Sequence, residues 1–164
     1  MSLWIVQNDR LHLVDPNTGN WTVLGPPAWG GTTSMTAHGA GAVTALYIVQ
    51  NSRLHEVNPA TGAWRVLPDQ NGNEAVWDGP TSITSVGTHL YIVQNSRLHR
   101  VQLNGHYQVL PDQGGNADVW AGTMAIAAPA NQPYLFIVQN SRLHRVDTNG
   151  HWQVLAAQGG NAAV

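Results

Sequence analysis

The sequence contains no cysteine and no lysine, and charged residues make up only 10% of its 164 residues. Without cysteine the chain can form no disulfide, no thiolate nucleophile and no cysteine-ligated zinc site. Seven arginines stand against nine acidic residues, which gives a formal net charge of −2. A protein that binds nucleic acid through its phosphates needs a basic face. The composition therefore argues against nucleic acid as a partner.

Long apolar runs are also missing. No stretch approaches the roughly 20 apolar residues of a membrane-spanning helix, so we expect no membrane insertion. No signal peptide precedes the first strand-like run at Leu3, and the sequence leaves the localisation unassigned. The apolar residues show no helical period and occur instead in short β-branched or aromatic runs. The sequence therefore predicts an all-β protein.

One motif occurs four times along the chain, beginning at Leu3, Leu46, Leu90 and Leu135, with offsets of 43, 44 and 45 residues. Each copy continues into Arg-Leu-His, and the last three share the octet Ile-Val-Gln-Asn-Ser-Arg-Leu-His without a change. Identity of this degree within one chain indicates recent duplication or deliberate engineering.

Each unit contains four short strand signals. In the second unit these are a strand at 46–50, a two-residue turn at Asn51-Ser52 and a strand at 53–57, then a longer turn and a strand at 64–67. Asparagine tolerates the positive φ that a two-residue hairpin turn needs. A fourth strand of small residues is expected at 34–37, 82–86 and 124–128.

Four short antiparallel strands per roughly 44 residues is the period of a β-propeller blade. We expect residues 1–164 to form a single β-propeller domain or half-domain, with repeats at approximately 1–33, 34–81, 82–123 and 124–164 and the small-residue strand nearest the axis. The pattern yields fifteen strands, one inner strand short of four full blades. Open ends would expose large apolar patches. A homo-oligomer in which two chains close an eight-bladed ring is therefore an alternative to a compact monomer.

The blade pattern resembles the β-propeller lectins of the tachylectin-2 and tectonin type over the whole chain, in period and strand order. The Asp-Pro-Asn-Thr-Gly-Asn-Trp turn at 15–21 also resembles kelch repeats, although Gln-Asn replaces the kelch double glycine. The lectin resemblance implies non-enzymatic sugar binding in inter-blade loops rich in Trp, Asn and Gly. The repeated octets equally fit an engineered or reconstructed propeller.

The loops at 69–77 and 112–120, and the last copy at 158–161, are the candidate binding sites. A sugar needs a flat apolar wall for its C–H face and amide or carboxylate partners for its hydroxyls. The candidate ligand-binding residues are Trp29, Trp77, Trp120, Asn73, Asn116, Asn161, Gln70, Gln113, Asp69 and Asp112. On this interpretation, replacing Trp77 and Trp120 with alanine abolishes binding and spares the fold. Alternatively, the tryptophans are wedges between blades and the Gly and Asn residues only make turns.

Two further patterns recur in every unit. The histidines His12, His55, His99 and His144 lie on separate blades, so we interpret them as core residues rather than as a metal site. Gln and Arg flank each hairpin turn, and this polar fringe either hydrogen-bonds one blade to the next or binds a ligand; we favour the former.

No motif for nucleophilic, phosphate or metal chemistry occurs, and the acidic residues lie mostly in turns. We therefore expect no catalytic residue, no metal and no cofactor. The leading hypothesis is multivalent carbohydrate binding with glycans as partners. The alternatives are a ligand-free scaffold that self-assembles, or a kelch-like propeller that binds protein through the surface of the ring.

Overall fold

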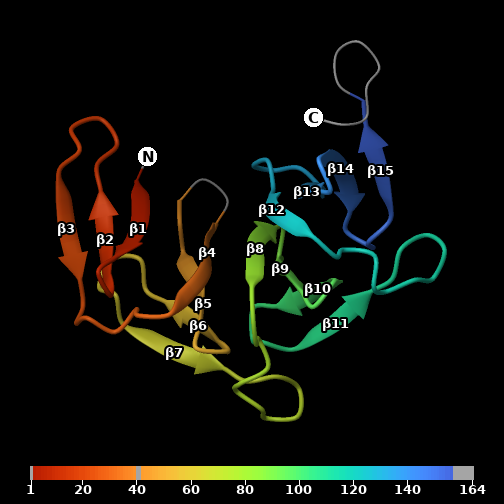
Figure 1. Cartoon of the computed structure of the whole chain (residues 1–164). Coiled ribbons are helices and arrows are strands. Elements are labelled where there is room, and N and C mark those ends of the chain that lie inside the picture. Colours follow the sequence, from red (N-terminus) through yellow and green to blue (C-terminus); the bar gives the residue numbers. More distant parts are fainter. Residues whose placement is uncertain (1, 40–41, 157–164) are drawn as a thin grey trace.

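The computed structural model describes residues 2–39 and 42–156 as four antiparallel sheets that follow one another along an arc (Figure 1). The fifteen strands are β1 (Leu3–Gln7), β2 (Arg10–Val14), β3 (Trp21–Leu24), β4 (Thr32–His38), β5 (Ala45–Gln50), β6 (Arg53–Val57), β7 (Trp64–Leu67), β8 (Thr81–Val86), β9 (His89–Gln94), β10 (Arg97–Gln102), β11 (Tyr107–Leu110), β12 (Thr123–Ala127), β13 (Tyr134–Gln139), β14 (Arg142–Asp147) and β15 (Trp152–Leu155). Within these ranges no helix is long and apolar enough to cross a membrane.

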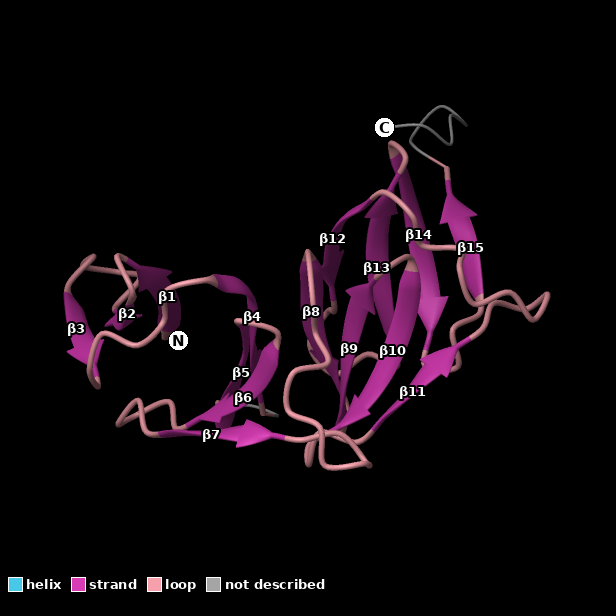
Figure 2. Ribbon diagram, turned by 60° about the horizontal axis from the view of Figure 1, so that its bottom comes forward, coloured by secondary structure: helices cyan, strands magenta, loops and turns pink. Residues whose placement is uncertain are grey.

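Each sheet is a meander in which consecutive strands pair. The first sheet has the order β1-β2-β3, and the other three have four strands each, β4 to β7, β8 to β11 and β12 to β15. The expected propeller architecture, with one inner strand fewer in the first blade, is therefore confirmed for the described residues. Figure 2 shows the sheets standing side by side as separate blades.

The inner strands β4, β8 and β12 lie next to one another, with β8 in contact with both others. They carry the small residues Ala37, Ala125 and Ala127, as expected for the crowded centre of a propeller. All three strands begin earlier than the sequence suggests, at Thr32, Thr81 and Thr123. In β4 and β12 a bulge adds an extra residue near the start.

The hairpin turns have the conformation that their sequences predict. Asn51 and Ser52 have φ angles of 47° and 65°, and the corresponding pairs of the other units also have positive φ. Two consecutive residues with positive φ make a type I′ turn, which suits the right-handed twist of the strands. The turn fixes the register, so that Gln50 pairs with Arg53 and Ile48 with His55, as expected.

The hydrophobic core lies between neighbouring sheets. We call the face that a sheet turns toward the preceding sheet its leading face, and the opposite face its trailing face. Tyr47 and Val49 on the trailing face of the second sheet pack in one cluster with Leu90 and Ile92 on the leading face of the third. Equivalent clusters join the first sheet to the second and the third to the fourth. Burial on both faces of a strand therefore requires a neighbouring sheet on each side.

Candidate functional site

The three loop tryptophans are part of these cores. Trp29, Trp77 and Trp120 are each 2% exposed. The ring of Trp77 lies edge-on to His99, at a centroid distance of 5.3 Å, and is 5.1 Å from Tyr107 of the next sheet. The main-chain N–H of Trp77 donates to the carbonyl of Ser52 at 2.9 Å. The structure thus has the arrangement expected of inter-blade wedges, and in this chain none of these three rings is open to a sugar.

A glutamine of the following sheet holds each tryptophan loop in place. Gln94 Nε2 donates to the carbonyls of Val76 (3.1 Å) and Asp78 (2.8 Å), on either side of Trp77. Gln50 and Gln139 make the same pair of bonds around Trp29 and Trp120. We call this arrangement the glutamine clamp. It confirms for three of the four fringe glutamines, Gln50, Gln94 and Gln139, that they hydrogen-bond one blade to the next.

Two of the four arginines of the fringe form ion pairs within their own blade. Arg53 lies 3.5 Å from Glu74, and Arg97 pairs with Asp118. Both pairs are solvent-exposed, so each contributes little to stability. Neither of these two pairs joins one blade to the next.

The predicted polar loop residues mostly bond to their own loops. Asp112 Oδ1 accepts from the main-chain N–H groups of Gly114 and Asn116, both at 2.8 Å. The bond from Asn116 is the main reason that the pKa of Asp112 lies below its usual value. Asp69 makes the same turn through Asn71 and Asn73. Asn73 and Asn116 are exposed, whereas Asn161 lies outside the described residues.

The two loop glutamines join neighbouring sheets. Gln113 Oε1 accepts from the main-chain N–H of Trp152 at 3.1 Å, and its Nε2 donates to the Trp152 carbonyl at 3.4 Å. Gln70 Oε1 accepts from the N–H of Tyr107 at 3.1 Å. Gln70 also lines a cleft of about 320 Å³ together with His89 and Arg100.

The recurrent histidines of the last three units are buried between aromatic rings. His55 Nδ1 lies 3.4 Å from the Ile48 carbonyl, and His99 Nδ1 lies 3.3 Å from the Ile92 carbonyl. His144 Nδ1 has no hydrogen-bond partner within the described part of the chain. The same part contains no group of three residues placed to hold a metal ion. Burial is the main cause that lowers the pKa of both His55 and His99 below their ordinary 6.5.

We expect stability to fall in mild acid because of these two histidines. Between pH 6.5 and their lower folded-state pKa values the unfolded chain binds more protons, so the free energy of unfolding decreases as the pH drops. Chemical denaturation at several pH values should show this slope, and replacing His55 and His99 with asparagine should reduce it. His106→Asn, at an exposed position, is the control. An unchanged slope in the double variant would contradict the assignment.

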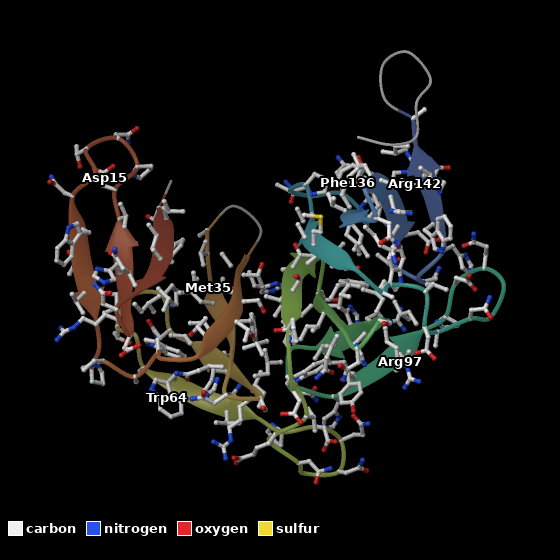
Figure 3. All side chains as sticks on the ribbon, in the orientation of Figure 1. Asp15, Met35, Trp64, Arg97, Phe136 and Arg142 are labelled. Atoms are coloured by element: carbon white, nitrogen blue, oxygen red, sulfur yellow. The ribbon has the colours of Figure 1, made fainter. Side chains whose placement is uncertain are left out.

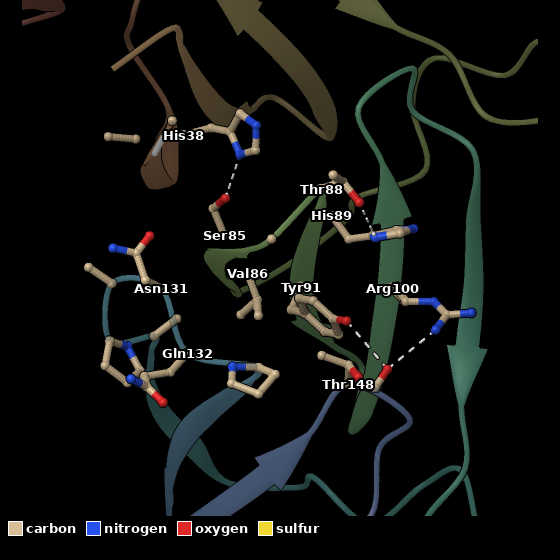
Figure 4. Close-up of a pocket in the computed structure, with 17 residues that line it drawn as sticks. His38, Ser85, Val86, Thr88, His89, Tyr91, Arg100, Asn131, Gln132 and Thr148 are labelled. Carbon is tan, nitrogen blue, oxygen red and sulfur yellow. Dashed lines mark hydrogen bonds between the residues drawn. The ribbon is translucent and has the colours of Figure 1, made fainter. Parts of the chain in front are cut away.

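A larger cleft lies at the C-terminal ends of the inner strands β4, β8 and β12. It has a volume of about 780 Å³ and is formed by the second, third and fourth sheets where β4, β8 and β12 end (Figure 4). Its side chains able to form hydrogen bonds include His38, Ser85, His89, Arg100, Asn131 and Gln132. Of the predicted site residues that the structure describes, none lines this cleft.

Hydrogen bonds across the sheets shape the walls of the cleft. His38 Nδ1 and Ser85 Oγ are 2.7 Å apart and link β4 to β8. On the opposite side, Tyr91 Oη and Arg100 Nη1 both donate to the Thr148 carbonyl, at 3.3 and 3.4 Å. Figure 4 shows both interactions. The walls are therefore braced between sheets rather than built from one loop.

The charge inside the cleft is positive. Burial, and then the neighbouring Arg100, lower the pKa of His89, so this histidine is neutral at pH 7. Arg100 is the one permanently charged residue of the described lining, which holds no acidic side chain. The cleft therefore offers one cation amid neutral donors and acceptors.

The connections that follow the inner strands differ in length. The connection between β8 and β9 is only Gly87-Thr88, whereas residues 128–133 between β12 and β13 have the sequence Ala-Pro-Ala-Asn-Gln-Pro. This longer connection, in which Asn131 has a φ of 60°, forms one wall. The connection between β4 and β5 is also six residues long, so the length of 128–133 does not by itself mark the cleft in the sequence.

No protein-family model matches the chain, and no curated protein matches it. Solved structures do. A chain of a nidogen/laminin complex is 12% identical with a TM-score of 0.67, over 94% of this chain and 61% of that one. An auxiliary nutrient binding protein from Bacteroides thetaiotaomicron VPI-5482 is 12% identical with a TM-score of 0.65, over 96% and 39%. Regucalcin from Agrobacterium tumefaciens C58 is 20% identical with a TM-score of 0.61, over 94% and 55%.

These likenesses show that the chain has a β-propeller fold. The chain spans about half the length of the solved structures it matches. At such low sequence identity the similarity indicates a shared fold but not a shared activity. The expected resemblance to tachylectin-2 and tectonin lectins is not confirmed by it.

Proposed function

We propose that the chain is a non-enzymatic carbohydrate-binding propeller whose ligand occupies the cleft at the ends of β4, β8 and β12. The observation that carries this proposal is the mixed lining of a cleft of about 780 Å³. The amides of Asn131 and Gln132 both donate and accept, as sugar hydroxyls require. Pro129, Pro133 and Val86 supply apolar surface for the C–H groups of the ring.

The single cation narrows the ligand class. Arg100 has no carboxylate among the described lining residues and keeps guanidinium N–H groups beyond the one bonded to Thr148. A guanidinium pairs well with a carboxylate. We therefore expect the cleft to favour sugars that carry a carboxylate, such as uronic acids, over neutral ones.

The Ser85–His38 pair makes hydrolysis the alternative to consider. In a catalytic triad a third group orients the histidine and stabilises its charged form. The described residues of the lining include no carboxylate for that role. We therefore assign the pair to bracing the wall and expect a bound glycan to be recovered unchanged.

The comparisons support binding of a ligand in general terms. One of the propellers that this chain resembles is described as nutrient binding, and another occurs in a complex with laminin. Protein binding is thus the second candidate for this chain. The lining of the cleft by three sheets, with both polar and apolar groups, favours a small ligand over a protein surface.

A glycan array followed by titration calorimetry tests the proposal. We expect binding of acidic glycans, and at least a tenfold weaker affinity in the double variant Arg100→Gln with Gln132→Ala, because each lost hydrogen bond to ligand is worth about 1 kcal/mol or more. The matched control is Asn73→Ala with Asn116→Ala in the predicted loops. No glycan binding at millimolar concentration would overturn the proposal. Loss of binding in the loop variant alone would move the site to the loops.

A further inference from the structure

We propose that the leading face of the first sheet docks, head to tail, onto the trailing face of the fourth sheet in a second copy of this chain. Two copies joined in this way at both ends would close an eight-bladed ring. The proposal rests on an interface that the chain already contains three times. It does not depend on the nature of the ligand.

The internal interfaces define what a covered face looks like. On the leading faces of the second, third and fourth sheets the same residue pattern recurs at 0% exposure: Leu46, Ile48, Val57, Leu90, Ile92, Val101, Leu135, Ile137 and Val146. Each set packs against apolar residues on the trailing face of the sheet before it. In the second sheet, which has a neighbour on each side, all six residues of β5 are buried.

The leading face of the first sheet has the same residues without this cover. Leu3 and Ile5 correspond to Leu46 and Ile48, and they are 47% and 40% exposed. Along β1 the exposure alternates, with the leading side exposed and Trp4 and Val6 on the trailing side partly buried. β1 and β5 have the same pattern of apolar residues. The absence, among the described residues, of a sheet packed on the leading face of β1 therefore accounts for its greater exposure.

Two polar and aromatic features of the first sheet point the same way. Trp21 is 62% exposed and contacts His12 with no inter-blade tryptophan beside it, whereas Trp64 and Trp152 each contact one. Gln7 is exposed, whereas the glutamines at its position in the other sheets are buried in the glutamine clamp. Among the strands that the structure describes, β1 pairs on one side only, whereas β5, β9 and β13 each pair on both sides.

The trailing face of the fourth sheet is the matching half. Along β13, Leu135 and Ile137 on the leading side are buried, and Phe136 and Val138 on the trailing side are only partly so. The corresponding trailing residues Tyr91 and Val93 of the third sheet are 1% and 6% exposed. Figure 3 shows Phe136 on the fourth sheet and Asp15 on the first, on either side of the open part of the arc.

Charge complementarity accompanies the apolar match. In the third sheet Arg100 reaches the β14–β15 turn of the next sheet, where it donates to Thr148. Arg145 occupies the same position in the fourth sheet and is exposed. The corresponding turn of the first sheet carries Asp15, also exposed. Head-to-tail docking would therefore bring Arg145 near Asp15 of the second copy.

A second copy is the occupant that satisfies both faces at once. A contact between two different patches of the same molecule repeats until the rotation closes it into a ring. The four sheets already follow an arc, and the first and fourth flank its open side (Figures 1 and 2). A second copy carries the complement of each face, so two copies cover all four end faces at once.

The mass of the assembly in solution tests the proposal directly. By light scattering and native mass spectrometry we expect about twice the 17.7 kDa of one chain. Ile5→Glu should give single chains, because it places a charge in the docked face. Ala60→Glu adds the same charge to an exposed turn away from both end faces and should leave the dimer intact. Circular dichroism checks that each variant remains folded.

Mixing two interface variants distinguishes head-to-tail docking from other dimers. Ile5→Glu retains a normal trailing face. Leu143 pairs with Val138 on the trailing face of the fourth sheet, so Leu143→Glu retains a normal leading face. Mixed together, they should form a dimer through the one intact pair of faces, although neither dimerises alone. A wild-type mass other than two chains, or a dimer that Ile5→Glu leaves unchanged, overturns the proposal.

Discussion

Replacing Trp77 with alanine is expected to destabilise the fold by about 3–5 kcal/mol, the usual cost of removing a buried tryptophan. The side chain is 2% exposed and is shared by the second and third sheets. Domains of this size have a total stability of only about 5–15 kcal/mol. Chemical denaturation followed by far-UV circular dichroism should therefore show a large fall in the midpoint.

Trp64→Ala provides the control for this experiment. Trp64 is 48% exposed, although it also contacts an inter-blade tryptophan, Trp29, with ring centroids 6.1 Å apart. Since half of its surface is already in water, we expect a clearly smaller loss. If the Trp77→Ala variant kept its stability and lost glycan binding, Trp77 would not be an inter-blade wedge. It would instead be a sugar-binding residue.

Gly150→Ala is expected to cost about 2 kcal/mol more than Gly115→Ala. Both glycines have positive φ, 94° and 84°, so an added Cβ strains each backbone by a similar amount. At Gly150 the new atom would also lie 2.7 Å from the Pro111 carbonyl oxygen and 2.9 Å from Leu110 Cβ. That main-chain oxygen cannot move aside without shifting the third sheet.

Gly115 has open space around it, with no atom within 4 Å of an added Cβ. The difference between the two alanine variants therefore isolates the close approach of the fourth sheet to the third. Thermal melts of both variants at one pH measure it. Equal melting temperatures would show that the two sheets can move apart at little cost.

Much of the fold could be predicted because its information is local and repeated. The Asn-Ser pairs specify type I′ turns, and those turns set the register of Gln50 against Arg53. Because the same hairpin sequence occurs in all four units, predicting one hairpin predicts the corresponding part of every blade. The sequence pattern predicts later starts than Thr32 and Thr123 for β4 and β12, because a bulge leaves no clear trace in the pattern of apolar residues.

The functional site was harder to predict because it depends on contacts between sheets. A tryptophan in a polar loop such as 69–77 suits a sugar platform and a buried wedge equally well. Its burial follows from Gln94, which lies on the next sheet and fastens the loop on both sides of Trp77. The cleft likewise combines residues of three sheets, so no single stretch of sequence displays it.

The glutamine clamp bonds to main-chain carbonyls, which every amino acid possesses. The hydrogen bonds of the clamp to a neighbouring loop therefore do not depend on most of the side chains in that loop. Substitutions at the exposed loop positions can accumulate without loosening the joint between modules. This gives the molecule a frame on which new recognition surfaces can evolve while the spacing of its blades stays constant.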